Sequence, residues 1–279
     1  MYRPNPDPRV PDASPVYRFA AGVAFSTFHV QRWRFDVRGA EHLPATSGAV
    51  LAANHDSFWD FFTVGRHGYY AHGRPLRILA KESLFRTPVF GWLMRRAEHI
   101  PVHRGAGADA LRSAVTALRG GEHVLVLPEQ TISPAFELME FKTGAARMAA
   151  AAGVPLVPAA TWGSHRFHTV GRLPRWSWRL PVTVAYGAPL HPTPDDDPVE
   201  VTHELRTAVA ALLDDAVRSY PDGTPAGAWW VPARYGGGAP TPDAAREYLD
   251  ELAAEWRRTH PDGARPDADG PDDGDARAS

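Results

Sequence analysis

Short runs of apolar residues alternate along the chain with longer segments whose apolar side chains recur at helical spacing. The short runs predict strands at residues 34–38, 49–53, 78–80, 99–102, 124–127, 156–162 and 182–186. The helical spacing predicts helices at residues 57–69, 88–96, 108–119, 143–152 and 199–219, and a last one within 239–260. Strands that alternate with helices are typical of an α/β domain with a largely parallel central sheet flanked by helices.

The pattern also divides the chain into four segments. Residues 1–33 form a proline-rich arm followed by an apolar helical segment, residues 34–220 hold the alternating elements, and residues 221–260 form an extension with one helix. Residues 261–279 are dominated by Asp, Pro, Gly and Ala. Because this composition offers little apolar surface to bury, we expect a disordered acidic tail.

The apolar segment 16–33 is too short to span a bilayer. Its charge-free part, residues 19–28, is about half of the roughly 20 residues that a span needs. Two interpretations stay open: an amphipathic helix packed against the domain, or a helix lying on a membrane surface. In the second, lipid would contact Phe19, Val23, Phe25, Phe28 and Trp33. No signal-peptide pattern is visible, so we expect a cytoplasmic protein that is at most peripheral on the inner face of the cell membrane.

The composition of the chain excludes several kinds of site and argues against one class of partner. The chain has 279 residues, 44% of them hydrophobic, which is enough for one large domain with a substantial core. It contains no cysteine, which excludes disulfides, thiolate catalysis and zinc sites that need sulfur. No histidine pair with metal-ligand spacing stands on a clear helix, so we expect no metal. The formal net charge of −2 argues against a nucleic-acid partner.

One long interval is basic although the whole chain is not. No acidic residue lies between Glu140 and Asp195, whereas the interval contains three tryptophans and the basic residues Lys142, Arg147, Arg166, Arg172, Arg175 and Arg179. Arginine pairs with phosphate at two points and tryptophan tolerates a wet interface, so the segment suits anionic headgroups or the phosphates of a carrier. An ordinary solvated strand face is the competing interpretation.

The stretch LAANHDSFWDFF, residues 51–62, carries the candidate catalytic chemistry. An imidazole takes a proton from a hydroxyl near neutral pH when a carboxylate fixes its tautomer, so His55 and Asp60 are a candidate base and orienting acid. Residues five apart do not share a helix face, so the chain must bend between them, at a strand-to-helix turn capped by Ser57. The pair has no nucleophile of its own and would activate a hydroxyl of the substrate. Ser57 and Asp60 also fit a Ser-x-x-Asp helix cap, so a purely structural role stays open.

Four short segments follow one another in a fixed order, each at a predicted strand end or loop. They are Asn54-His55 with Asp60, HIPVHR at 99–104, LPEQTIS at 127–133 and VPLVP at 154–158. In this order they resemble the motifs of the glycerophospholipid acyltransferase family, which includes the 1-acylglycerol-3-phosphate acyltransferases. The resemblance covers roughly residues 34–187.

The resemblance implies an activity and roles for single residues. His55 matches the family's general base and Asp60 the aspartate that orients it; the activated hydroxyl would attack an acyl thioester, and CoA or acyl carrier protein would leave. Arg104 matches an arginine that contacts the acceptor's phosphate, while Glu129 and Thr131 match the third motif, Pro-Glu-Gly-Thr-Arg, and are expected to bind substrate. The implied protein is an O-acyltransferase of phospholipid biosynthesis, with a membrane lysophospholipid, first of all 1-acylglycerol-3-phosphate, as acceptor, and with no cofactor beyond the acyl-CoA or acyl carrier protein co-substrate.

The third motif departs from the family at two positions. Gln130 stands where glycine is usual, and Ile132 stands where an arginine usually helps to hold phosphate. The loss of this arginine should weaken binding of a small phosphomonoester, unless Lys142 compensates from the start of the next predicted helix. Two alternatives therefore stay open: acylation of another lipid alcohol, such as a glycolipid or aminolipid precursor, and a non-catalytic lipid-binding protein. A serine hydrolase is disfavoured, because the chain has no Gly-x-Ser-x-Gly elbow.

Overall fold

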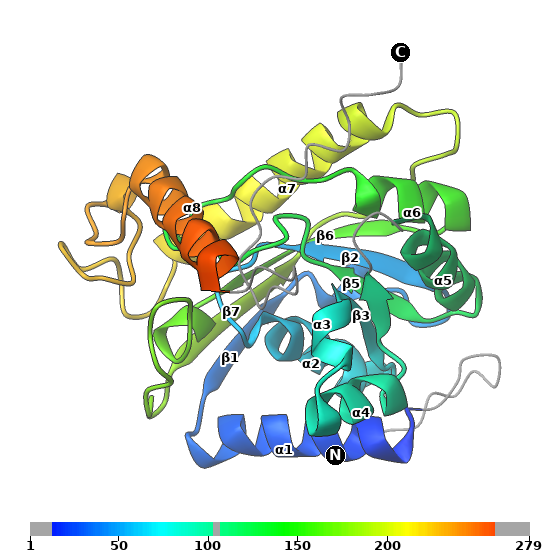
Figure 1. The fold of residues 1–279 in the computed structure, drawn as a ribbon, viewed down its shortest axis with the longest axis horizontal. Coiled ribbons are helices and arrows are strands. Elements are labelled where there is room, and N and C mark those ends of the chain that lie inside the picture. Colours follow the sequence, from blue (N-terminus) through cyan, green and yellow to red (C-terminus); the bar gives the residue numbers. More distant parts are fainter. Residues whose placement is uncertain (1–12, 103–106, 260–279) are drawn as a thin grey trace.

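The structure, a computed structural model, describes residues 13–102 and 107–259. Within these residues the strands form one sheet of seven, in the order β1-β7-β6-β2-β5-β3-β4 (Figure 1). They are β1 Arg34–Arg38, β2 Ala49–Ala53, β3 Leu76–Lys81, β4 Ile100–Val102, β5 His123–Val126, β6 Leu156–Trp162 and β7 Pro181–Tyr186. All neighbouring pairs are parallel except β6 with β7. The predicted α/β class with a largely parallel sheet is confirmed.

Most helices lie close to their predicted positions. The helices are α1 Pro15–Val30, α2 Asp60–His72, α3 Glu82–Phe85, α4 Pro88–Arg96, α5 Gly107–Arg119, α6 Gly144–Ala152, α7 Pro198–Arg218 and α8 Pro242–Thr259, with short 3₁₀ helices η1 Ala40–His42, η2 Ser164–Arg166 and η3 Ala233–Tyr235. The short α3 was not predicted, and α2 is displaced by three residues. Local chemistry sets the ends: Thr87 caps α4 by accepting the Gly91 N–H at 3.0 Å, and Gly153 ends α6 with φ +68°.

Helices cover both faces of the sheet, with α1, α2 and α4 on one face and α5, α6 and α7 on the other (Figure 1). The side chains of the central strand β2 alternate between two hydrophobic cores. Leu51 and Ala53 pack with α1 and α2, whereas Val50 and Ala52 pack with α5, α6 and α7. All five residues of β2 are buried, so the residues that follow Ala53 leave a rigid strand.

In the first helix, some of the apolar side chains pack in the core and others are exposed. Phe25 and Phe28 of α1 and the following Trp33 are buried in the core with α2 and the sheet, so the expectation that they contact lipid is wrong. Phe28 stacks on Trp33 with ring centroids 4.5 Å apart, within a cluster of aromatic rings in this core. Phe19 and Val23 are 72% and 56% exposed and remain available to lipid.

The strand ends that matter for function meet at one edge of the sheet. β2 pairs in parallel with both β5 and β6, so their carboxyl ends lie side by side. The residues after β2, β5 and β6 therefore converge, as ligand-binding residues do in open α/β sheets. Residues 261–279, the predicted disordered tail, and 1–12 lie outside the described residues, and the predicted division into four segments stays a prediction.

Candidate active site

His55 and Asp60 contact each other at this edge. Nδ1 of His55 lies 3.0 Å from Oδ2 of Asp60. Since a carboxylate oxygen accepts, Nδ1 carries the proton, and the lone pair is on Nε2. The imidazole side chain is 18% exposed and the carboxylate is fully buried. The ring is thus held from behind and open to a substrate on its other side.

The Asp60 carboxylate is surrounded by donors. Besides His55, Oδ2 accepts the backbone N–H groups of Asp56 and Ser57, each at 2.8 Å, and Oδ1 accepts the hydroxyl of Ser164 at 2.9 Å. Asp60 is also the first residue of α2, where the helix dipole is positive. These contacts stabilise a negative charge and leave the carboxylate one orientation, which in turn fixes the imidazole.

The chain bends between the two residues, but the bend differs from the predicted one. The predicted helix start at Ser57 is wrong: α2 begins three residues later, because the N–H groups of Asp56 and Ser57 turn back to Asp60. Ser57 is not the cap; its hydroxyl donates to the His168 carbonyl at 2.8 Å and accepts from Trp59 N–H. Asp60 makes the contacts that both interpretations expect of it, because the same oxygen accepts the two N–H groups of the turn and contacts Nδ1 of His55.

Glu129 supports the backbone of His55. One oxygen accepts the His55 N–H and the other accepts the Met139 N–H, both at 2.8 Å. The His55 carbonyl in turn accepts the Ser133 N–H at 2.9 Å, so the segment after β5 holds both sides of this residue. Burial raises the pKa of Glu129 to about 8, while its two backbone donors act in the opposite direction. Glu129 was expected to bind substrate, whereas the hydrogen bonds of its carboxylate are with the backbone N–H groups of His55 and Met139.

Asn54 joins the site to the neighbouring strand. Its side-chain oxygen accepts the Thr161 N–H at 2.8 Å, and its amide donates to the Thr161 carbonyl at 3.0 Å and to Asp56 at 2.8 Å. Burial, with the nearby charges of Glu129 and Asp60, raises the pKa of the Asp56 carboxyl well above its usual range. This buried polar network fixes the position from which His55 leaves β2.

The two departures in the third motif have different structural settings. Gln130 is exposed and has φ +62°, in the left-handed region that glycine occupies without strain. Ile132 is 5% exposed, and Thr131, expected to bind substrate, is 7% exposed. The isoleucine thus replaces the expected arginine with a side chain that is packed inside rather than presented to a ligand.

Of the two basic residues expected to contact phosphate, the structure describes Lys142 and not Arg104. Lys142 is exposed just before α6, with its N–H bonded to the Pro128 carbonyl at 3.1 Å. This bond fastens the lysine to the segment that carries Glu129. Arg104 lies outside the described residues, so its role as a phosphate contact stays a prediction.

Ser164 is the contact that the sequence patterns did not identify. The Gly163-Ser164-His165 stretch lacks a nucleophile elbow, yet its serine bonds to Asp60 because β6 ends beside β2. Gly163 has φ +107°, and an added Cβ there would lie 2.4 Å from the Pro181 carbonyl oxygen. The sequence signal that could have identified Ser164 is a glycine followed by a polar residue directly after a strongly apolar strand.

The chain is similar in sequence and fold to known proteins. The family model described as Acyltransferase matches residues 34–162. A 1-acyl-sn-glycerol-3-phosphate acyltransferase from Bacillus subtilis is 32% identical over 151 residues, which are 53% of this chain and 72% of that protein. The crystal structure of the 1-acyl-sn-glycerophosphate (LPA) acyltransferase PlsC from Thermotoga maritima superposes with a TM-score of 0.59 at 25% identity, covering 71% of this chain and 78% of that one.

Fold and site together define an α/β protein with a histidine–aspartate pair at the carboxyl edge of its sheet. The chain belongs to the acyltransferase family of the 1-acyl-sn-glycerol-3-phosphate acyltransferases. The match spans only part of other relatives: 40% of the chloroplastic 1-acyl-sn-glycerol-3-phosphate acyltransferase from Brassica napus, at 31% identity over 50% of this chain, and 56% of the enzyme from Pseudomonas aeruginosa, at 30% identity over 54% of this chain.

Proposed function

We propose that the protein is an O-acyltransferase that moves a fatty acyl chain from an acyl thioester, acyl-CoA or acyl carrier protein, to the hydroxyl of 1-acylglycerol-3-phosphate. The observation that carries the proposal is the 3.0 Å contact between Nδ1 of a partly exposed His55 imidazole and the buried Asp60 carboxylate. A base without a protein nucleophile suits transfer to a hydroxyl that the substrate brings.

The proposed steps use the geometry directly. Nε2 of His55 takes the proton of the acceptor hydroxyl as its oxygen attacks the thioester carbonyl carbon, and Asp60 stabilises the imidazolium. The tetrahedral intermediate then expels the thiolate, which receives the proton from Nε2. A thioester is already activated, so the proposed reaction needs no cofactor beyond this co-substrate.

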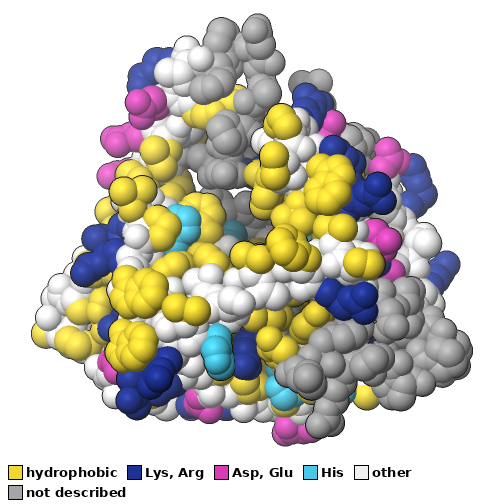
Figure 2. Space-filling view, turned by 90° about the horizontal axis from the view of Figure 1, so that it is seen from below, with side chains coloured by type: hydrophobic (Ala, Val, Ile, Leu, Met, Phe, Trp, Pro, Cys, Tyr) yellow, Lys and Arg dark blue, Asp and Glu magenta, His cyan; other side chains and the backbone are white. Residues whose placement is uncertain are grey.

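A peripheral location on the inner face of the cell membrane is part of the proposal. Its support is a set of exposed apolar side chains on the adjacent helices α1 and α4, namely Phe19, Val23, Val30, Val89, Phe90 and Trp92. Figure 2 shows hydrophobic side chains gathered on the face of the molecule that contains α1. In the part of the chain that the structure describes, no helix is both long and apolar enough to cross a bilayer.

A second acceptor class is favoured by Ile132. Because this position presents a buried apolar side chain instead of an arginine, a lipid alcohol without a phosphomonoester, such as a glycolipid or aminolipid precursor, is the alternative acceptor. The two acceptors share the same base and the same thioester chemistry, so only a direct comparison of acceptors separates them.

The test is acyl transfer by the purified full chain. Long-chain acyl-CoA and acyl carrier protein are offered as donors to lysophosphatidic acid, other lysophospholipids and lipid alcohols, beside His55→Ala, with products identified by mass spectrometry. We expect product from the native chain and a loss of several powers of ten in the variant. If no acceptor is acylated with either donor while vesicles are still bound, the protein is a non-catalytic lipid-binding member of the family.

A further inference from the structure

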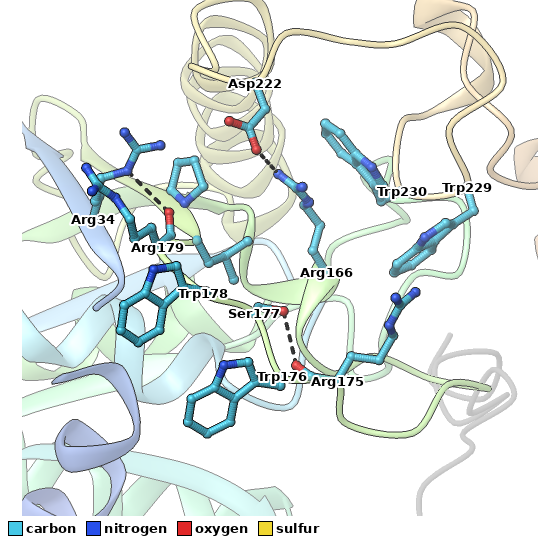
Figure 3. A pocket seen from close by; sticks show the side chains of 12 residues that line it. Arg34, Arg166, Arg175, Trp176, Ser177, Trp178, Arg179, Asp222, Trp229 and Trp230 are labelled. Carbon is cyan, nitrogen blue, oxygen red and sulfur yellow. Dashed lines mark hydrogen bonds and ion pairs between the residues drawn. The ribbon is translucent and has the colours of Figure 1, made fainter. Parts of the chain in front are cut away.

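A pocket of about 400 Å³ lies apart from His55 and Asp60, beside the antiparallel strand β7 (Figure 3). Four parts of the chain line it: the start of β1 at Arg34, Arg166 at the end of η2, the segment 175–181 that leads into β7, and residues 222–230 after α7. β7 and β1 are the two strands beyond β6, so the pocket opens along the same sheet edge as the active site but beside the last strands. None of the motifs of the active site uses it.

The pocket carries an excess of positive charge. Its lining holds Arg34, Arg166, Arg175 and Arg179 against one carboxylate, Asp222. That carboxylate is already paired with Arg166 at 2.5 Å, and the same guanidinium lies 4.2 Å from the ring centre of Trp230. Among the described residues, no carboxylate lies within ion-pair distance of the other three arginines. Arg166 is therefore part of the pocket wall, and the positive charges of Arg34, Arg175 and Arg179 are available to a ligand.

Exposed aromatic side chains stand beside these arginines. Trp176 and Trp178 are 67% and 54% exposed. Arg32 lies 5.2 Å from the ring centre of Trp178, and Arg172 lies 4.0 Å from that of Trp229. Tryptophan and arginine together are the side chains that favour the headgroup level of a membrane, where one end is apolar and the other meets phosphate.

The segment is exposed but fastened to the fold. Gln31, directly after α1, accepts the Ser177 N–H through its side chain and the Arg179 N–H through its carbonyl, both at 2.7 Å. The Arg175 N–H donates to the Phe167 carbonyl at 2.8 Å. The backbone that carries these arginines and tryptophans is therefore held in place before any ligand arrives, which lowers the entropic cost of binding.

The same bonds place the pocket next to the apolar surface of α1. Val30, the last residue of that helix and 59% exposed, immediately precedes Gln31. A membrane that contacts α1 would therefore extend toward Trp176 and Trp178. This continuity with the apolar surface of α1 favours a lipid headgroup over a soluble phosphate compound as the ligand.

We propose that Arg34, Arg175 and Arg179, with Trp176 and Trp178, form a binding site for the phosphate of an anionic membrane lipid, separate from the acceptor's own site. The inference rests on the proposed membrane location and adds a residue-level contact to it. Its role is to orient the domain on an anionic surface rather than to take part in acyl transfer.

The test compares vesicles of phosphatidylcholine with vesicles that also contain phosphatidylglycerol, by co-sedimentation of the full chain. The variant is Arg175→Gln with Arg179→Gln. Its matched control is Arg112→Gln with Arg147→Gln, two exposed arginines on α5 and α6. Each cation near an anionic surface adds about five-fold to binding, so we expect about thirty-fold weaker binding of the variant to anionic vesicles. Binding to neutral vesicles, and binding of the control, should change little.

Calorimetric titration with free CoA separates the two sources of phosphate. We expect equal CoA affinity for the native chain and the Arg175/Arg179 variant. Loss of CoA affinity with vesicle binding intact would overturn the proposal and make the pocket a nucleotide-phosphate site. Unchanged binding of the variant to anionic vesicles, or an equal loss in the control, would also overturn it.

Two further measurements keep this proposal distinct from the proposed function. His55→Ala should bind anionic vesicles like the native chain, whether or not transfer is ever observed. Transfer to an acceptor dispersed in uncharged detergent should survive in the Arg175/Arg179 variant. A variant that loses transfer in detergent as well would place these arginines at the reaction rather than at the membrane, which contradicts the proposal.

Discussion

Ser164 donates a 2.9 Å hydrogen bond to Oδ1 of Asp60, while His55 contacts Oδ2 of the same carboxylate. The two contacts hold the carboxylate from opposite sides, although Ser164 lies more than a hundred positions further along the chain. The serine belongs to none of the four motifs, and it holds the carboxylate that orients the His55 imidazole.

Replacing Ser164 with alanine should therefore slow the reaction without weakening substrate binding. A hydrogen bond to a charged group is worth about 1.5–3 kcal/mol, so we expect kcat to fall about ten-fold or more with KM unchanged, measured by steady-state acyl transfer. Thr161→Val is the control, since it removes a buried hydroxyl that bonds to Thr63 at 3.0 Å and not to the Asp60 carboxylate. An equal loss of kcat in the control would attribute the effect to general loosening.

Asp60→Asn should be more damaging. An amide cannot accept from His55 and from the N–H groups of Asp56 and Ser57 with equal strength, so the imidazole loses its tautomer and its orientation. We expect kcat to fall by about 10³–10⁴, as for comparable replacements in histidine–aspartate systems. The double variant with His55→Ala should be no slower than His55→Ala alone, because Asp60 acts through the histidine. A further drop in the double variant would give Asp60 an independent role.

Lys142→Met tests whether Lys142 takes over the phosphate contact of the arginine that Ile132 replaces. Lys142 is exposed before α6 and is fastened to Pro128 through its backbone. If it pairs with the acceptor's phosphate, KM for a phosphomonoester acceptor should rise about ten-fold, the worth of one charge-assisted contact, with kcat nearly constant. Lys142→Arg should retain the native KM, and KM for an uncharged lipid alcohol should not respond to either change. An unchanged KM in Lys142→Met would remove this lysine from the acceptor site.

Gln130→Gly should stabilise the protein or leave it unchanged. Gln130 has φ +62°, which costs a non-glycine residue about 1–2 kcal/mol, while glycine adds about 0.4–1 kcal/mol of unfolded-chain entropy. The balance favours glycine by up to about 1.6 kcal/mol, which would appear as a higher urea midpoint. Gln130→Ala keeps the strained conformation and should resemble the native chain. A clear loss of stability in Gln130→Gly would show that the glutamine side chain itself makes a stabilising contact.

Three buried histidines predict a loss of stability in mild acid. Burial lowers the pKa of His99, His123 and His165 to about 3 each. The unfolded chain binds protons at these positions near pH 6.5 and the folded chain does not, so their contribution is complete above that pH and is lost progressively as the pH falls toward 3.

The measurement is the urea midpoint at pH 7.5 and pH 5.5 for the native chain and His123→Gln. The buried carboxyls of Asp56 and Glu129, whose pKa values are raised, change stability in the opposite direction, but they are common to both proteins. We therefore expect a smaller drop between the two pH values in the variant. An identical drop would mean that His123 is protonated in the folded state.

The local sequence predicted the elements well because each strand and helix carries its own periodicity. The predicted boundaries of β2, β6 and α4 are those observed, since buried strands and a capped helix start are defined within a few residues. His55 and Asp60 could be paired from the sequence because they lie on one short turn, where a carboxylate within reach of an imidazole is a local feature.

Contacts between distant segments were decided only by the tertiary structure. The bonds from Ser164 to Asp60 and from Glu129 to the backbone of His55 depend on β2 lying between β5 and β6, and no local pattern specifies strand order. Likewise, apolar residues on α1 do not reveal which of them pack inward, because that depends on the helix and sheet beneath. By itself the sequence determined where most elements lie and that His55 and Asp60 share one short turn. Pairing between remote strands, which follows from packing the whole core, decided which side chains hold His55 and Asp60 in place.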